Sequence, residues 1–330
     1  MAFYSYMFTA NYKRFFGKLK QVAKKEKRSF LFLTMDTAWC VFRYGLCLTD
    51  YLNFEIYNRT ADQRKEYVGA RTENTFYETV SPSQYKKRYT VKPNFLADFK
   101  EYTRRDFIVP TEENKDQVLA FLNKHSVFMS KPYDGLGGQD VTKVYRENIG
   151  DLEEYYQQCV EKKIFLEELV VQHPEMNVLC PKSVNTIRIM TFNDHGKPEI
   201  IWMGLRVGNG LNDVDNFHAQ GMGVKVDIET GKLVGNAIDK DNREFTVHPT
   251  TGVQFDGFQI PCFQEAKEMV LKASLESDKI LVVGWDVAIS DKGPLIIEGN
   301  RRPGFDLPQV LDARGRMDMI RDVTARATKN

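Results

Sequence analysis

Apolar and aromatic residues recur at helical spacing through the first ninety positions of the chain. Residues 12–28 predict a basic amphipathic helix, because apolar side chains return every three or four positions and lysines occupy much of the remaining wheel. The apolar positions are Tyr12, Phe15, Phe16, Leu19, Val22 and Ala23. Residues 30–90 also predict helices, without a motif that carries chemistry. We therefore expect a mainly helical N-terminal region over residues 1–90.

From about residue 91 the pattern changes to short apolar runs that alternate with turns and helices. Strands are predicted at residues 127–130, 141–145, 164–171, 186–192, 199–207, 223–228, 280–289 and 295–299. Helices are predicted near residues 112–124, 151–162 and 262–276. The last two strands are expected to form a hairpin that turns at residues 290–293. Antiparallel strands with intervening helices indicate the α+β class.

Charge is distributed unevenly along the chain. The net charge of the 330 residues is only +1, which gives no argument for binding nucleic acid. Residues 1–30, however, contain eight lysines and arginines against Glu26 alone, a local charge of +7 that leaves −6 for the remainder. The basic helix is therefore expected either to pack on the rest of the protein or to contact anionic lipid or a membrane-bound partner.

Cysteine usage and hydropathy bear on the compartment. The five cysteines are widely spread and include no CxxC pair, which argues against a disulfide framework or a thiolate zinc site. The most apolar stretch, residues 30–48, is interrupted by Asp36 and Arg43 before it reaches the roughly 20 residues of a bilayer span. No positive region precedes the first apolar residues, so no signal peptide is expected. These features predict a cytoplasmic protein without a transmembrane segment.

A lysine followed by a glycine-rich segment is the first candidate for chemistry. Lys131 ends a predicted strand, and Gly135, Gly137 and Gly138 follow before the next strand. Backbone without Cβ atoms can approach phosphate oxygens closely, while the lysine supplies a positive charge. Neither GxGxxG nor GxxxxGK[ST] matches, because this loop joins two strands and its lysine comes first. The segment is either a phosphate-binding loop or a simple hairpin.

The strand at residues 164–171 contains acids near its end and is followed by another acid. Glu168 and the backbone at Leu169 and Val170 could take the amino group of an adenine, and Glu175 the hydroxyls of a ribose. The alternative is a strand that leads into a surface loop with ordinary acids.

The predicted C-terminal hairpin contains the sharpest pattern. Its turn makes Asp286 and Glu298 near cross-strand partners, with Cβ atoms about 5 Å apart, and Asn300 lies on the same face as Glu298. Two buried carboxylates at this distance need a cation or a basic group. Carboxylate and amide oxygens are ligands that suit Mg²⁺ beside phosphate. The competing interpretation is neutralisation by arginines, for which the candidates are Arg188, Arg301 and Arg302.

Arg188 and Arg206 lie inside predicted strands. A half-buried arginine suits an anionic substrate or a phosphoryl group in transfer, but it also suits a structural ion pair. Residues 215–223 have the composition of a functional loop.

In this order, a lysine with a glycine-rich loop, an acid-tipped strand, strand arginines and a D…ExN pattern resemble the ATP-grasp superfamily, which includes D-alanine–D-alanine ligase. More narrowly, SVNTIRI, VDNFHAQGMG, VVGWDVAI and IIEGNRRPG resemble the sugar-transfer-associated ATP-grasp group, found beside polysaccharide-assembly genes. The resemblance implies two α+β subdomains that clasp ATP. Their expected bounds are residues 91–171, with the phosphate loop, and 172–330, with the metal and substrate site.

The resemblance also implies roles for individual residues. It assigns the ATP phosphates to Lys131, to the glycine-rich loop and to an earlier lysine that Lys92 matches. It assigns the adenosine to Glu168, to the backbone after it and to Glu175. The two Mg²⁺ ions would be bound by Asp286, Glu298 and Asn300.

Two features depart from the classical ligases of the superfamily. Their Rossmann-like first domain is replaced here by the helical region. The arginine that they place two residues before the metal aspartate is Gly284 in this chain. Arg188 is the candidate to take its role, and the acceptor site does not carry over.

The resemblance implies a ligase that uses ATP and Mg²⁺ to join a carboxylate to an amine through an acyl phosphate, in modification of a cell-surface polysaccharide or glycan. Lys131, Arg188 and Arg206 are the expected catalytic residues. The expected partners are the small-molecule or glycan acid and amine, and polysaccharide-assembly enzymes. The alternatives are a small-molecule or sugar kinase and a non-catalytic ATP-binding partner of a glycosyltransferase.

Overall fold

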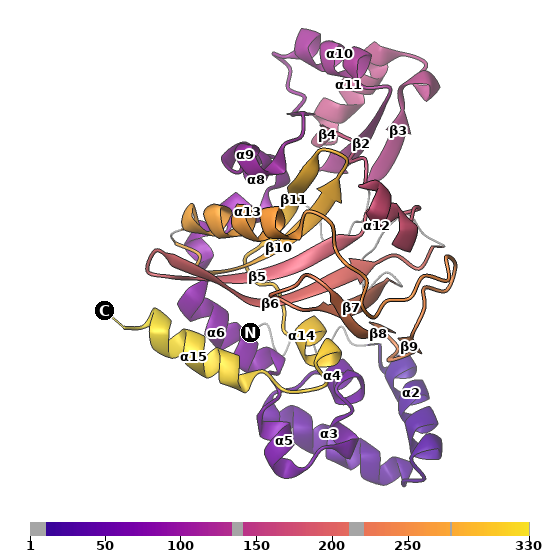
Figure 1. Ribbon diagram of the computed structural model, residues 1–330, viewed down its shortest axis with the longest axis vertical. Helices are drawn as coiled ribbons and strands as arrows, with labels where there is room; N and C mark the ends of the chain where they lie inside the picture. Colours follow the sequence, from indigo (N-terminus) through magenta and orange to yellow (C-terminus); the bar gives the residue numbers. More distant parts are fainter. Residues whose placement is uncertain (1–10, 134–140, 211–220, 278, 330) are drawn as a thin grey trace.

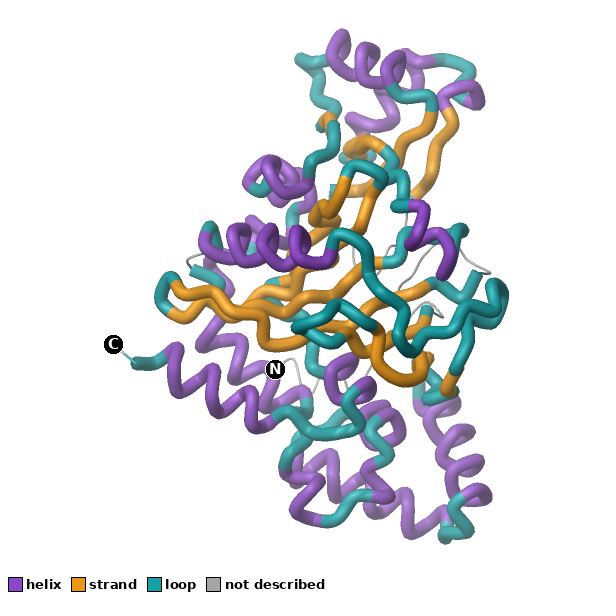
Figure 2. Tube along the Cα trace, in the orientation of Figure 1, coloured by secondary structure: helices purple, strands orange, loops and turns teal. Residues whose placement is uncertain are grey.

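The protein, seen in a computed structural model, is described over residues 11–133, 141–210, 221–277 and 279–329 (Figure 1). A large antiparallel sheet occupies the centre, a helical region lies at one end, and a smaller sheet with two helices lies at the other (Figures 1 and 2). Within these ranges, no helix combines the length and the apolar character needed to cross a bilayer.

The N-terminal region is helical, as predicted, and extends to residue 103. Beyond the expected boundary at residue 91, the chain stays helical and packs on the large sheet through Phe95 and Phe99, whose rings lie 6.5 and 5.4 Å from that of Trp285. The helices are α2 (Tyr12–Lys25), α3 (Phe30–Tyr44), α4 (Leu48–Asn53), α5 (Ala61–Lys65), α6 (Ala70–Val80), α7 (Lys87–Thr90), α8 (Lys92–Asp98) and α9 (Lys100–Thr103).

The basic helix α2 packs on the body of the protein. Its apolar residues Phe15 and Leu19 are buried in a core shared with the large sheet. On its polar side, Arg14 and Lys18 form ion pairs with Asp241. Packing within the chain thus accounts for the buried apolar residues of this helix.

The smaller sheet has the strand order β1-β4-β2-β3, with every neighbouring pair antiparallel. Two helices cover one face, where Val118, Tyr156 and Leu166 belong to a separate small core. The elements are β1 (Phe107–Ile108), α10 (Lys115–Lys124), β2 (Val127–Pro132), β3 (Thr142–Tyr145), α11 (Leu152–Glu161) and β4 (Ile164–Glu168). The predicted glycine-rich loop, with Gly135, Gly137 and Gly138, lies outside the described residues.

The large sheet has the order β11-β10-β5-β6-β7-β8-β9. Alternate side chains of its strands serve two cores: Ile187 and Ile189 face the side of α13, whereas Met190 and Phe192 face the helical region. Its elements are α12 (Pro174–Leu179), β5 (Thr186–Asp194), β6 (Lys197–Val207), β7 (Met222–Val226), β8 (Leu233–Asp239), β9 (Glu244–Phe245), α13 (Phe263–Leu275), β10 (Val282–Ser290), β11 (Gly293–Asn300), α14 (Asp306–Leu311) and α15 (Met317–Ala327). The sequence analysis did not predict α12, β8, β9, α14 or α15.

The close approach of Gly315 to the helical region gives a test of this packing. A Cβ atom at Gly315 would lie 2.0 Å from the carbonyl oxygen of Glu66, which also accepts a hydrogen bond of 3.0 Å from the amide of Met317. We expect Gly315→Ala to lower the free energy of unfolding by about 1–3 kcal/mol, because backbone must move. Gly150→Ala is the control, since a Cβ there meets nothing within 4 Å. Urea unfolding measures both, and equal effects would contradict the packing.

Candidate active site

The two sheets meet where the chain leaves β4. The predicted strand 164–171 ends at Glu168, because the following residues run beside the tip of the β10–β11 hairpin instead. The carbonyl of Val171 accepts a hydrogen bond of 3.0 Å from the amide of Asp291, and the amide of His173 donates one of 2.9 Å to Ile289. Residues 169–173, which we call the strap, thus connect the small sheet to the large one.

A cavity of about 240 Å³ opens beside this strap. Glu168, Leu169 and Val170, the residues predicted to bind adenine, all line it. The carboxylate of Glu168 is already engaged there, since it accepts hydrogen bonds from the amide of Asp106 at 3.1 Å and from Lys292 at 3.4 Å. The backbone of residues 169 and 170 is therefore the better candidate to bind an adenine edge.

Glu167 and Arg105, neither of them predicted, join the sheets at a buried contact. Arg105 donates hydrogen bonds to the carbonyl oxygens of Ile296 (3.0 Å) and Ile297 (3.2 Å) in β11, and one of its nitrogens lies 3.5 Å from a carboxylate oxygen of Glu167 in β4. Glu167 also binds the ammonium group of Lys131. Arg105 and Glu167 are almost completely buried, with exposures of 5% and 3%. Glu167 and Arg105 thus connect Lys131 to β11, the strand that contains Glu298 and ends at Asn300.

The electrostatics of Glu167 follow from these contacts. Burial alone would raise the pKa of this carboxyl, but the charges of Lys131 and Arg105 outweigh burial and lower it. The sequence contained one signal, an acid at an inward-facing position of an otherwise apolar strand. Lys131 and Glu167 lie diagonally across the β2–β4 pair, as the pairing of Lys131 with Phe165 shows.

Lys92 begins helix α8 next to this contact. Its amide donates a hydrogen bond of 3.0 Å to the carbonyl of Tyr133, the last described residue before the glycine-rich segment. Its charge also contributes to lowering the pKa of Glu167. Pro93, which follows directly, is compatible with the first turn of a helix. The structure therefore brings both predicted phosphate-binding lysines, Lys92 and Lys131, to the surroundings of Glu167.

The predicted cross-strand pairing of Asp286 with Glu298 is confirmed by the register of β10 and β11. Asp286 is 2% exposed and binds two guanidinium groups. Arg188 contacts both of its oxygens, at 2.5 and 3.1 Å, and Arg206 contacts one, at 2.9 Å. Burial opposes ionisation here, yet the two arginines hold the pKa of Asp286 at about 2. Neutralisation by arginine therefore applies to Asp286.

Arg301 and Arg302, the other arginines considered, point to the helical region. Arg301 donates to the carbonyl of Ser81 at 3.0 Å, and Arg302 donates to the side chain of Asn74 at 3.2 Å. Neither of these hydrogen bonds reaches the two acids of the hairpin.

Glu298 has the opposite electrostatic character. Burial, and then the charge of Asp286, raise its pKa. Its carboxylate accepts a hydrogen bond of 3.2 Å from the side-chain amide nitrogen of Asn300. The side-chain oxygen Oδ1 of Asn300 accepts no hydrogen bond from the described residues. The charges of Arg206 and Arg188 offset these two causes only in part, so a bound cation would stabilise the ionised form of Glu298.

These donors fit a hard divalent cation. Mg²⁺ commonly takes one or two carboxylates and completes its shell with water and phosphate. Across the described part of the chain no three histidine, cysteine, aspartate or glutamate side chains form a metal cluster. The set at this point is one available carboxylate on Glu298, the amide oxygen of Asn300, and Asp286 behind them.

Gly284 explains how Arg188 reaches Asp286. Arg188 stands opposite Asp286 in the register of β5 and β10. A Cβ atom at Gly284 would lie 2.3 Å from the Cβ of Pro303 and 3.3 Å from the Cδ of Arg188. The glycine thus leaves room for Pro303 and for the side chain of Arg188 from the neighbouring strand.

A second pair of acids, Glu73 and Asp306, was not predicted. Arg188 donates a hydrogen bond of 3.1 Å to the carbonyl of Pro303, and the next amide, of Gly304, donates one of 3.2 Å to the hydroxyl of Tyr77. Glu73 lies one helical turn before Tyr77 on α6. Burial, followed by the charges of Asp306 and Asp50, raises the pKa of Glu73 to about 8.

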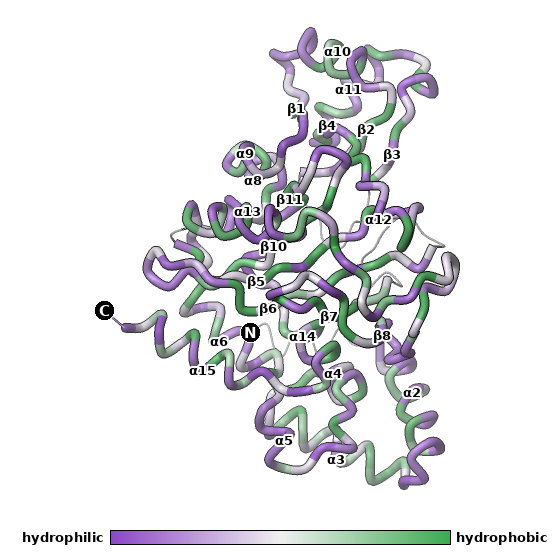
Figure 3. Tube along the Cα trace, in the orientation of Figure 1, coloured by the Kyte–Doolittle hydropathy of each residue, from purple (hydrophilic) through white to green (hydrophobic). Residues whose placement is uncertain are grey.

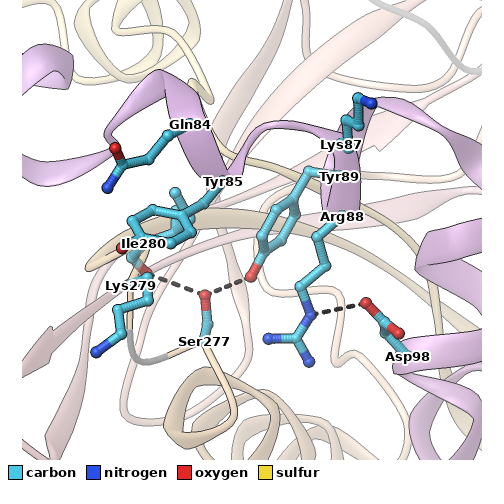
Figure 4. Close-up of a pocket in the computed structure, with 9 residues that line it drawn as sticks. All are labelled: Gln84, Tyr85, Lys87, Arg88, Tyr89, Asp98, Ser277, Lys279 and Ile280. Carbon is cyan, nitrogen blue, oxygen red and sulfur yellow. Dashed lines mark hydrogen bonds and ion pairs between the residues drawn. The ribbon is translucent and has the colours of Figure 1, made fainter.

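Two features lie apart from this constellation. Glu175, the predicted ribose ligand, is exposed in the first turn of α12 and is absent from the walls of the 240 Å³ cavity. A larger hollow of about 520 Å³ lies near the start of β10 (Figure 4). Its walls include Arg88, which is paired with Asp98 at 3.1 Å, and none of the predicted site residues.

The comparisons with known proteins agree with the fold. The sequence profile described as sugar-transfer-associated ATP-grasp matches residues 105–325. The chain therefore belongs to the sugar-transfer-associated ATP-grasp family, and the expected α+β fold with a helical N-terminal region is confirmed. A comparison with curated proteins finds no match.

Solved structures of ATP-grasp ligases resemble the chain at low sequence identity. The ligase PsnB in complex with a minimal precursor has a TM-score of 0.46 and 14% identity, over 75% of this chain and 64% of PsnB. The D-alanine–D-alanine ligase from Coxiella burnetii has a TM-score of 0.42 and 10% identity, over 73% of this chain and 58% of that ligase. The chain thus spans a little less than two thirds of either ligase.

The two hairpin acids should respond oppositely to neutralisation. Asp286→Asn leaves Arg188 and Arg206 without their carboxylate, so we expect a loss of about 3–5 kcal/mol in the free energy of unfolding. Because the folded state raises the pKa of Glu298, its contribution to stability is present below the unfolded pKa of about 4.3 and is lost as pH rises through the folded pKa. Glu298→Gln should therefore be more stable than the parent at neutral pH without metal.

Urea unfolding in the presence of a chelator, from acidic to neutral pH, measures both variants. The difference between Glu298→Gln and the parent should disappear towards acidic pH. A Glu298→Gln protein that is less stable than the parent at neutral pH would contradict this assignment.

Proposed function

We propose that the protein is an ATP- and Mg²⁺-dependent ligase that joins a carboxylate to an amine through an acyl phosphate. The observation that carries this proposal is the chain of contacts from Lys131 through Glu167 and Arg105 to β11. It supports a single site in which cationic side chains of the small sheet act together with the acids of the large sheet.

In this proposal ATP binds between the two sheets. Lys92 and Lys131, together with the glycine-rich segment, would bind its phosphates. The backbone at Leu169 and Val170 would bind the adenine edge. Lys131 would then share its charge between Glu167 and the phosphates, so that one acid keeps the lysine in place when the nucleotide is absent.

Mg²⁺ would be held by Glu298 and Asn300, with Asp286 as a further oxygen ligand or as the anchor of the arginines. Its chemistry would be to neutralise the charge that develops on the phosphates during transfer. The raised pKa of Glu298 supports this role.

The substrate carboxylate would be oriented by Arg188 and Arg206. Arg188 already donates three hydrogen bonds, two to Asp286 and one to Pro303, and a guanidinium carries five N–H groups, so two remain for a second anion. A carboxylate oxygen would attack the γ-phosphorus of ATP, with ADP as the leaving group. The amine nitrogen would then attack the acyl carbon, which releases phosphate and a proton, while an arginine stabilises the oxyanion.

The amine would approach from the side of Glu73 and Asp306. Both acids and Arg188 act electrostatically on Tyr77, whose hydroxyl accepts the hydrogen bond from Gly304. A carboxyl with a pKa of about 8 is mostly protonated at neutral pH, but its ionised fraction is a stronger base than an ordinary carboxylate and would accept the proton that the amine loses. We propose a sugar acid or glycan as the acid or amine partner, in assembly of a surface polysaccharide together with other enzymes of that process.

The test follows ATP turnover with a panel of sugar acids, amino sugars and amino acids, using acids labelled with ¹⁸O in the carboxylate. Release of ADP should require Mg²⁺, an acid and an amine, and one ¹⁸O atom should appear in the released phosphate. Glu298→Gln should lower kcat by more than about 100-fold while remaining folded, whereas the exposed Glu78→Gln should have no effect.

Other outcomes would replace the proposal. ADP together with a stable phosphorylated product would identify a kinase. ATP binding without any release of ADP across the panel would identify a non-catalytic ATP-binding protein.

A further inference from the structure

Helix α3 exposes a continuous apolar face at the end of the molecule opposite the small sheet (Figures 1 and 3). Five large side chains on this face are each more than half exposed. They are Leu31 at 68%, Phe32 at 53%, Met35 at 61%, Trp39 at 55% and Phe42 at 74%. At 100° per residue they fall within about 100° of the helical wheel, so they form one stripe.

The opposite side of α3 is also apolar and is buried. Leu33 and Cys40 are fully buried in the core of the helical region. The single acid of the helix, Asp36, faces inward, where it pairs with Arg64 at 2.6 Å and accepts a hydrogen bond of 2.8 Å from Tyr51. Because the buried side of the helix is already occupied, the exposed apolar stripe is a second face, and an exposed patch of this kind marks contact with protein or membrane.

A basic stripe on α2 adjoins this face. Lys13, Lys20 and Lys24 fall within about 40° of one another on the helical wheel and form no ion pair with described residues. Phe16, beside them, has its ring 6.3 Å from that of Phe30 at the start of α3, and the ammonium of Lys20 lies 5.7 Å from the same ring. The stripe therefore borders the N-terminal end of the apolar face.

We propose that the outer face of α3 inserts into the interface of an anionic lipid bilayer, with the lysines of α2 bound to the headgroups. Aromatic and aliphatic side chains flanked by lysines, without an acid on the exposed face, are the chemistry of an interfacial helix. This proposal does not depend on the proposed function.

The charge distribution favours a bilayer over a second copy of the chain. A symmetric dimer through α3 would cover the apolar face, but nothing in the apolar face of the second copy would pair with the lysines that border it. An anionic bilayer instead attracts the lysines and accepts the apolar side chains. Docking at this end keeps the junction between the sheets away from the bilayer (Figure 1).

Trp39 provides an intrinsic probe, because Trp202 and Trp285 are buried at 3% and 0% exposure. The full chain is mixed with vesicles of phosphatidylcholine, with or without phosphatidylglycerol. We expect co-sedimentation and a blue shift of tryptophan emission with the anionic vesicles, both weakened by salt.

The triple variant Leu31→Ser, Met35→Ser, Phe42→Ser should bind these vesicles more than about 100-fold less tightly. Its matched control is Val234→Ser, Leu275→Ser, which removes exposed apolar side chains elsewhere and should bind as the parent does. The variant Lys13→Glu, Lys20→Glu, Lys24→Glu should lose the preference for anionic lipid. Circular dichroism and urea midpoints check that all variants are folded.

Two results would overturn the proposal. The first is a parent protein that does not bind vesicles, and if it instead forms dimers that the same three serine substitutions dissociate, the face is a protein interface. The second is a triple serine variant that binds vesicles as tightly as the parent.

Discussion

Arg105 is shared between two sheets that otherwise belong to separate cores. It donates hydrogen bonds to two backbone carbonyl oxygens of β11 and contacts Glu167 in β4. Glu167 in turn binds Lys131. Because the acid and the guanidinium are both almost completely buried, loss of either partner would leave a charge without compensation in the interior. The position of Lys131 relative to the hairpin acids thus depends on this buried contact, together with the backbone hydrogen bonds of Val171 and His173 to the hairpin.

The two hairpin acids divide their tasks through their surroundings. Asp286 is held ionised by two arginines, whereas its neighbour Glu298 is pushed towards its neutral form. Environments that drive the pKa values of adjacent carboxyls apart are a common means of giving equal groups different roles. Here Asp286 holds two arginines, and we propose that Glu298 is the acid that binds a cation.

Local patterns predicted much of this structure. Alternating apolar residues predicted β2, β5, β6, β10 and β11, and the hairpin turn was sufficient to pair Asp286 with Glu298. Strand β8 was missed because Gly235 and Asn236 interrupt its alternation and are exposed.

Contacts between distant segments could not be predicted in the same way. Arg105 precedes β1 by two residues and carries no motif, and its partners in β11 lie 191 and 192 positions away. Glu175 followed the family spacing, yet α12 begins at Pro174 and turns its side chain to solvent. The acid pair of Glu73 and Asp306 likewise depends on docking of α6 against the end of the large sheet.

Position 284 carries no side chain, and Arg188 reaches Asp286 from the neighbouring strand β5; we propose that it takes the role of the arginine that the resemblance to the classical ligases leads one to expect at position 284. In an antiparallel ladder, side chains on adjacent strands can reach the same volume, so a functional group can change its point of attachment without changing its location. Comparison along a single strand overlooks such an exchange. Comparison of cross-strand neighbours reveals such an exchange. It relates residues that no linear motif would align.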